Sequence, residues 1–147
     1  MALPPIFKTY LRGIDMTAPL IERTAEVYDF YRPIVNAAIP AIFVSEYVTD
    51  EGLRQYDSLW LFTPRLVMEA KSFLKTDDFD FAPIRLKMTY IRFLKEEYDF
   101  RRATEKSRLS VQCRDEGSVT YSLRASGANC DRLKDVSLRF LMRNLKL

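Results

Sequence analysis

The chain contains no histidine among its 147 residues. Histidine is the commonest general base and proton shuttle in enzymes, so its absence excludes every catalytic triad built on that side chain. Only 4 glycines are present, and the sequence contains neither a glycine-rich phosphate-binding loop nor a P-loop. These absences lead us to expect a protein without enzymatic activity.

Cysteine is also scarce, because the chain has only Cys113 and Cys130. No other soft ligands accompany them, and Cys113 falls on the inward phase of a predicted strand, so we expect two buried thiols. The segment "TDDFDF" gathers Asp77, Asp78 and Asp80 but lacks the glycine and the later glutamate of a calcium-binding loop. We interpret it as a solvated turn, and we expect no metal and no cofactor.

The sequence has no long apolar run. Residues 34–44, "IVNAAIPAIFV", are the most apolar stretch, and they are much shorter than the roughly 20 residues of a membrane-spanning helix. The first ten residues lack the basic start and apolar stretch of a signal peptide, and two cysteines fit a reducing compartment. We expect a cytoplasmic protein, with peripheral membrane association as the alternative.

What is present is enough apolar material for one substantial core, since 48% of the residues are apolar and 13% are aromatic. We expect an N-terminal arm and helix over residues 1–40, packed on a domain of residues 41–147. Pro4 and Pro5 and the lack of a sustained period favour an extended arm over residues 1–16. A helix should follow over residues 17–32, capped by Thr17 and ended by Pro33.

From residue 41 the apolar period changes to two, which indicates strands. The first strands are expected at residues 41–49, 53–62, 65–71 and 84–93. Thr63-Pro64 should break the ladder between the second and third strands, the third being buried on one face only. Residues 74–83 are interpreted as a loop, and the phase slip at Tyr90-Ile91 predicts a bulge.

The last part of the chain predicts a hairpin and a helix. Residues 97–103 are expected to form a short strand, and residues 107–113 and 118–124 a hairpin with Val119, Tyr121 and Leu123 inward. Asn129 or Ser126 should cap a final helix. Four residues of that helix share an apolar face: Leu133, Val136, Phe140 and Leu141.

Seven antiparallel strands followed by a C-terminal helix resemble the pleckstrin-homology-like (PH-like) superfold, especially its GRAM and bacterial PH-like members. The segment "SLWLFTPRLVMEA" is similar to a strand pair of those domains, and "FAPIRLKMTYIRF" to the start of their next long strand. The resemblance covers residues 41–147 and implies a mainly β fold with helices (α+β), in which a partly open barrel is closed by the C-terminal helix. Asp50 and Glu51 stand where phosphoinositide-binding members carry basic residues, and Phe140 stands near a position that is often tryptophan.

Basic residues gather in the C-terminal half. Residues 84–147 carry 15 basic and 8 acidic side chains, against 8 and 12 in residues 1–83. Seven basic residues fall on outward strand positions or between strands: Arg85, Lys87, Arg101, Arg102, Lys106, Arg108 and Arg114. If their strands are neighbours, a positive sheet face forms that can bind an anion or an acidic partner. The alternative is a solvated face balanced by nearby carboxylates.

Three binding functions remain open. The first is a PH-like adaptor module that binds a protein partner, with Tyr28, Phe30 and Tyr31 as docking residues because aromatic side chains anchor interfaces. The second is peripheral binding to anionic membrane lipid through the basic sheet face, and the third is nucleic-acid binding. The final helix also mixes basic and apolar residues in a way that suits a membrane surface, although packing on the barrel requires similar amphipathicity. The sequence leaves the oligomeric state open.

Overall fold

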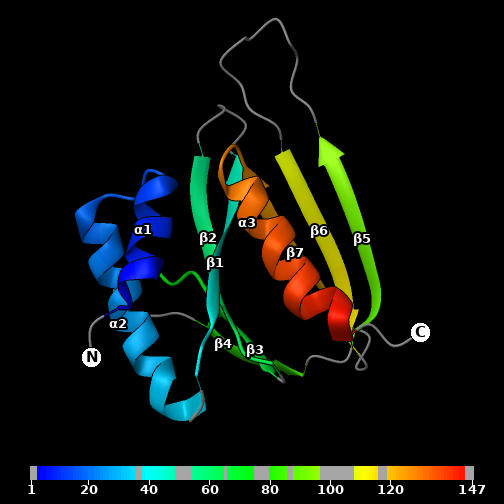
Figure 1. The fold of residues 1–147 in the computed structure, drawn as a ribbon, viewed down its shortest axis with the longest axis horizontal. Coiled ribbons are helices and arrows are strands. Elements are labelled where there is room, and N and C mark those ends of the chain that lie inside the picture. The colour runs from blue at the N-terminus through cyan, green and yellow to red at the C-terminus, as the bar shows by residue number, and fades with distance from the viewer. Residues whose placement is uncertain are drawn as a thin grey trace, which may run out of the picture.

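The computed structural model describes residues 3–35, 38–48, 54–64, 66–74, 80–85, 88–96, 108–115 and 119–144 (Figure 1). The N-terminal helices are α1 (Pro5–Gly13) and α2 (Ala18–Val35). Seven strands follow: β1 (Ala41–Val48), β2 (Arg54–Phe62), β3 (Leu66–Lys71), β4 (Asp80–Arg85), β5 (Met88–Glu96), β6 (Arg108–Asp115) and β7 (Thr120–Ser126). The chain then forms α3 (Asn129–Val136), which continues into a π-helical turn, η1 (Ser137–Leu141), and a 3-10 turn, η2 (Met142–Asn144).

The described strands form two antiparallel sheets, which confirms the expected α+β class. One sheet has the order β1-β2-β3-β4 and the other the order β5-β6-β7. The edge strands β1 and β7 lie next to each other, and α3 packs on the three-stranded sheet (Figure 1). The two sheets do not close into a barrel within the described residues.

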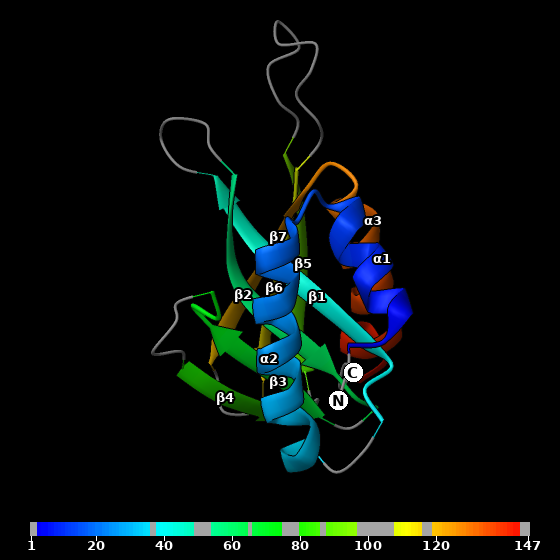
Figure 2. The ribbon, with the colours of Figure 1, turned by 90° about the vertical axis from the view of Figure 1, so that its left-hand side faces the viewer.

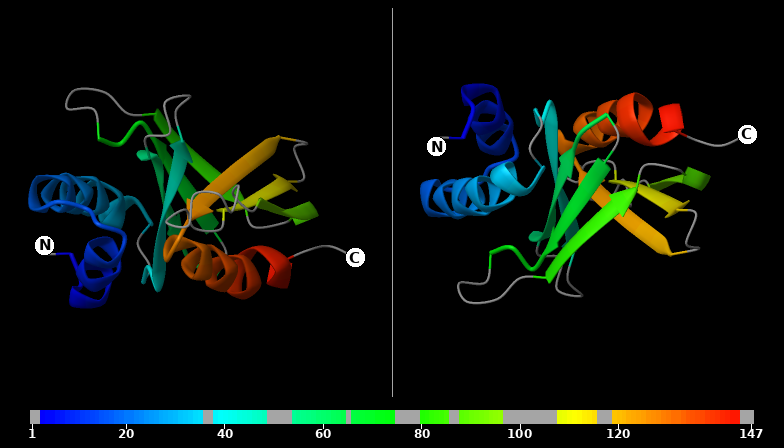
Figure 3. Two further views of the ribbon diagram at one scale, coloured as in Figure 1. Left: turned by 90° about the horizontal axis from the view of Figure 1, so that it is seen from above. Right: turned by 90° about the horizontal axis from the view of Figure 1, so that it is seen from below.

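Two apolar cores lie on opposite faces of the four-stranded sheet. The inner core joins both sheets and the C-terminal helix, with Trp60, Phe62 and Phe140 at its centre. The outer core joins the other face of the four-stranded sheet to α1 and α2, through residues such as Phe7 and Leu61. Figure 3 shows the resulting layers, with the N-terminal helices on one side of the molecule and the C-terminal helix on another.

The third strand is buried on both faces, so the prediction of one buried face was wrong. Met68 and Ala70 face the outer core, whereas Val67 faces the inner core. Glu69 lies on the inward phase as well and is only 7% exposed. Because Glu69 is charged, the sequence suggested that this second face was exposed to solvent. The break before β3 is confirmed, because the backbone N–H and the hydroxyl of Thr63 both donate to the Leu66 carbonyl at 2.8 Å.

The N-terminal segment is a helix and not the extended arm that the sequence suggested. Pro5 occupies the first turn, where a missing backbone N–H costs nothing. Leu3, Phe7, Leu11 and Ile14 follow helical spacing and are all buried in the outer core. Asp15 then adopts a φ of 66° and the Met16 N–H returns to the Leu11 carbonyl at 3.0 Å, which ends the helix.

The second helix also differs from its prediction, because it runs through Pro33 to Val35. A proline near the end of a helix removes a single hydrogen bond and keeps a φ that helices require. The helix lies across the outer face of the four-stranded sheet (Figure 2). Within the described residues, no helix is both long and apolar enough to cross a membrane.

The long strand predicted at residues 84–93 is in fact two strands. The first, β4, begins at Asp80 inside the expected loop and pairs with β3, whereas β5 belongs to the other sheet. An irregularity in the β5–β6 register occurs between Met88 and Tyr90, one position before the expected bulge. The short strand expected at residues 97–103 and the turn at 50–52 lie outside the described residues.

The C-terminal hairpin is confirmed, with Leu109, Val111 and Cys113 buried on β6. Leu123 is buried on β7 as expected, but Val119 at its start is 50% exposed. The final helix buries its predicted apolar face in the inner core. Neither expected cap is used, because the N-cap residue is Ala128 and its side chain makes no capping bond. The Asn129 side chain instead forms hydrogen bonds with β1, to the Val44 carbonyl and to Glu46.

Candidate functional site

The predicted basic face is only partly within the described residues. Arg85 ends β4 in the four-stranded sheet, opposite Leu66. Arg108 and Arg114 lie at the two ends of β6 in the other sheet, so β4 and β6 are not neighbours. Lys87, Arg101, Arg102 and Lys106 lie outside the described residues. Arg85 therefore does not share one basic sheet face with Arg108 and Arg114. A basic face formed by the other predicted residues stays a prediction.

Two of the three predicted docking aromatics are core residues. Tyr31 is fully buried and Tyr28 is 5% exposed, because both face the outer core. The Tyr28 ring contacts Phe7 edge-on, with ring centroids 5.9 Å apart. Only Phe30 reaches the surface, where it is 54% exposed. Burial removes Tyr28 and Tyr31 from a docking surface in this fold.

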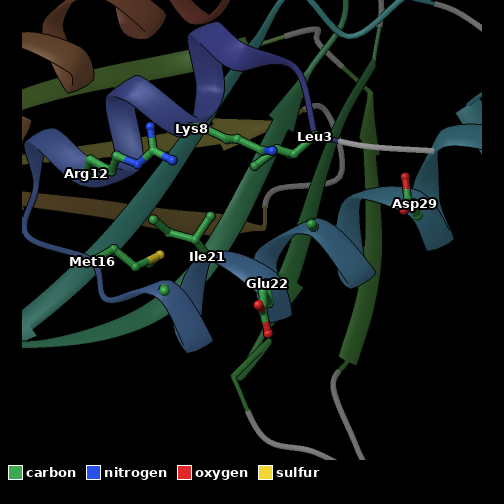
Figure 4. Close-up of a pocket in the computed structure, with 9 residues that line it drawn as sticks. Leu3, Lys8, Arg12, Met16, Ile21, Glu22 and Asp29 are labelled. Atoms are coloured by element: carbon green, nitrogen blue, oxygen red, sulfur yellow. The ribbon is translucent and has the colours of Figure 1, made fainter.

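A groove lies between α1 and α2 and has a volume of about 410 Å³ (Figure 4). Its floor is apolar and consists of Leu3, Met16 and Ile21, all of them largely buried, with Ala18 and Ala25 beside them. The Met16 Sδ lies 3.5 Å from the hydroxyl oxygen of Thr24, which donates its proton to the Leu20 carbonyl at 2.8 Å. A volume in this range is typical of sites that bind a ligand or the side chains of a partner.

The two walls of the groove carry opposite charges. Lys8 and Arg12 lie on α1, one turn apart, whereas Glu22 and Asp29 lie on α2 (Figure 4). Lys8, Arg12 and Glu22 form no ion pair with another residue of the described chain. Their charges are therefore available to a ligand, and a bound segment has to place acidic groups toward α1.

Comparison of the chain with protein-family models, with curated proteins and with solved structures finds no match. The groove and its surroundings therefore carry the functional argument.

A buried polar cluster fixes α1, and with it one wall of the groove. The Tyr10 hydroxyl accepts a hydrogen bond from the Val44 N–H at 2.8 Å and donates to Asn129 Oδ1 at 2.7 Å. The Asn129 amide donates to the Val44 carbonyl at 2.8 Å and to Glu46 Oε2 at 2.6 Å. The Ser126 hydroxyl donates to the other oxygen of Glu46 at 2.5 Å. Burial raises the pKa of Tyr10, so this phenol stays protonated and keeps its donor.

Further contacts tie the helical layer to the sheet. The Arg132 Nε–H donates to the Ile42 carbonyl at 3.0 Å, and its guanidinium lies 4.4 Å from the centre of the Tyr10 ring. The Tyr56 hydroxyl donates to the Ile14 carbonyl at 2.6 Å, and the Arg23 Nε–H donates to the Phe73 carbonyl at 2.9 Å. The groove is thus built on a fixed support, as a recognition surface requires.

Glu69 is a buried carboxyl in the inner core. Its Oε1 has no hydrogen-bond partner in the described part of the chain. Burial raises its pKa, against the opposing influence of Lys71 and of a hydrogen bond from Ser58, and Asp57 raises it further. No group of three potential metal ligands occurs among the described residues, so Glu69 does not belong to a metal site there. Asp77 and Asp78 lie outside the described residues.

Both cysteines are buried and free of disulfide bonds, which confirms that expectation. Burial raises the pKa of Cys113 to about 12, and burial also raises that of Cys130. We expect neither thiol to react with Ellman's reagent in the folded protein at mildly alkaline pH, because the reactive thiolate is absent and access is blocked. Both thiols should react after unfolding in guanidinium chloride. Rapid release of one equivalent from the native protein would contradict this assignment.

Proposed function

We propose that this protein is a non-catalytic PH-like binding module that holds a helical segment of a protein partner in the α1–α2 groove. The PH-like assignment is supported by the strand order in sheets of four and three, and by the helix that follows the last strand. The observation that carries the binding proposal is the apolar groove floor between walls of opposite charge.

A helical segment suits this groove for two reasons. An amphipathic helix places apolar side chains on one face at intervals of three and four residues, which matches an apolar floor between two helices. Its charged flanks would meet Lys8 and Arg12 on one side and Glu22 on the other. Such complementarity fixes the direction in which the segment lies and discriminates against wrong partners.

The test begins with a random peptide library displayed on phage and selected on the immobilised full chain. A synthetic version of the most enriched peptide is then measured by fluorescence anisotropy. We expect K8E/R12E to weaken its binding by about tenfold or more, because two attractive charges become repulsive. The conservative pair K8R/R12K should retain binding.

The control variant is R139E/R143E, which makes the same change in net charge on a different helix. It should bind the peptide as the unchanged protein does. Circular dichroism melting curves check that all variants are folded. Equal binding by K8E/R12E and by the unchanged chain, or a selection that yields no binding sequence, overturns the proposal.

Membrane binding through the basic sheet face and nucleic-acid binding remain predictions. Nucleic-acid binding uses exposed aromatic side chains that stack on bases. Near the predicted basic residues, Tyr90, Phe93 and Phe100 are the aromatic residues for this role; Phe93 is 41% exposed, and the side chains of Tyr90 and Phe100 lie outside the described part of the structure. The structure supports neither of these two functions as strongly as the groove supports the binding of a helical segment.

A further inference from the structure

The C-terminal helix has a second, exposed apolar face. Its buried face is complete, since Leu133, Val136, Phe140 and Leu141 all lie in the inner core. On its outer face, Leu138 is 60% exposed and Met142 is 40% exposed. These two residues are four positions apart, so their side chains lie side by side on the helix. Packing on the sheet does not account for them.

Cations surround this apolar pair. Lys134, Arg139 and Arg143 are all exposed. Arg139 forms an ion pair with Asp135 at 3.1 Å, and both side chains are about half exposed, so the pair is weak and can open. Residues 136–147 contain three basic residues and no acidic one. The outer face of this helix is therefore apolar at its centre, and its margins carry three cations and the carboxylate of Asp135, which leaves a net positive charge.

The charges decide what can cover this face. A second copy of the chain, docked through the same patch by a two-fold axis, would bring the arginines of both copies together, and like charges oppose that arrangement. An anionic membrane surface offers apolar material to Leu138 and Met142 and negative headgroups to the cations. Long basic side chains can keep their charges at the headgroups while their stems lie along apolar groups.

The three-stranded sheet beside the C-terminal helix contributes one more exposed apolar side chain, Phe93, to the same side of the molecule. Phe93 on β5 lies opposite Val111 on β6, and residues directly opposite share one face of a sheet. Val111 belongs to the inner core, which the C-terminal helix covers. The 41% exposed ring of Phe93 therefore faces the side of the sheet that carries this helix, and η2 contacts β5.

We propose that the outer face of the C-terminal helix, formed by Leu138 and Met142 with Lys134, Arg139 and Arg143, binds the surface of an anionic lipid membrane. Binding of this kind is interfacial: the helix lies along the surface and inserts only its exposed apolar side chains. The patch is small, so the attraction is weak and strongly dependent on salt. It does not rest on the groove, which lies in the helical layer on another side of the molecule (Figure 3).

The test is co-sedimentation of the full chain with vesicles of phosphatidylcholine alone or mixed with phosphatidylserine. Salt is set at about 0.01 M and at about 0.15 M, which differ about fourfold in screening length. We expect binding only to the mixed vesicles, and stronger binding at low salt. Both L138E and R139E/R143E should lower the partition coefficient by about tenfold, because each removes part of the contact.

Matched controls separate this surface from others. I6E places the same charge at another exposed apolar position, since Ile6 is 69% exposed on α1. K8E/R12E makes the same change in net charge in the groove, and R114E removes an exposed cation of the basic sheet face. All three should bind mixed vesicles within about twofold of the unchanged chain, a difference smaller than that of a single lost contact.

Three results overturn the proposal. The first is no binding to mixed vesicles at low salt, where attraction is least screened. The second is loss of binding in R114E or K8E/R12E with L138E unaffected, which would place the membrane contact elsewhere. The third is a concentration-dependent dimer in sedimentation velocity without lipid that L138E abolishes, because a second copy would then cover this face.

Discussion

Replacing Asn129 with leucine is expected to lower the free energy of unfolding by about 3 to 5 kcal/mol, because several buried polar groups lose their partners together. Leucine has a similar volume but neither a donor nor an acceptor. The Val44 carbonyl and Glu46 Oε2 lose a donor, and the Tyr10 hydroxyl loses its acceptor. Asn129 is fully buried, so water cannot replace these bonds without a rearrangement.

Chemical denaturation followed by tryptophan fluorescence measures this effect, since Trp60 is fully buried. The matched control is S137A on the same helix. Ser137 is also fully buried, but its hydroxyl has no hydrogen-bond partner in the described part of the chain. That substitution should change stability by less than about 1 kcal/mol. Equal losses for N129L and S137A would show that the cluster contributes nothing specific.

Replacing Glu69 with glutamine is expected to stabilise the protein at neutral pH by about 1 to 3 kcal/mol, because an ionised carboxyl with an unsatisfied oxygen is costly to bury. The raised pKa of Glu69 means that the folded state binds this proton more tightly than the unfolded state does. The group therefore favours folding below its unfolded pKa, and that contribution is lost as pH rises through the folded value.

The pH dependence provides the decisive measurement for this residue. Between the unfolded and the folded pKa of Glu69, the unchanged protein should lose stability as pH rises, and E69Q should lose less. The difference in unfolding free energy between the two proteins should be smallest in acid and largest near neutral pH. Because Asp57 also raises the pKa of Glu69, D57N should reduce this slope in the same direction, but by less than E69Q does. A constant difference at all pH values would contradict a titrating Glu69.

The elements that could be predicted from sequence are those whose burial pattern is local. The strands β1, β2, β6 and β7 appear within about two residues of their expected bounds, because β-branched and aromatic residues alternate there and turns separate them. The inward faces of β6 and of the final helix were likewise set by simple periodicity. The class of fold followed from these elements.

The groove could not be predicted because one of its walls was taken for an extended arm. The spacing of Leu3, Phe7, Leu11 and Ile14 was a usable signal, but the adjacent prolines outweighed it. The role of Asn129 was hidden for a different reason. Its partners Val44 and Glu46 precede it by 85 and 83 residues, so only the assembled fold brings them together. Near the start of a helix its local pattern suggested a cap.

The hydrogen bond between Tyr10 and Asn129 also bears on the order of folding, since it joins residues 119 positions apart. On the outer edge of β1, the hydroxyl of Tyr10 accepts a hydrogen bond from the Val44 N–H, and the side chains of Asn129 and Arg132 donate to the Val44 and Ile42 carbonyls. During synthesis α1 leaves the ribosome early, but its acceptor on α3 is made more than a hundred residues later. Until then β1 keeps an open edge to which another chain can add a strand. Closure of this edge should therefore be a late and slow step, and aggregation of nascent chains should depend on it.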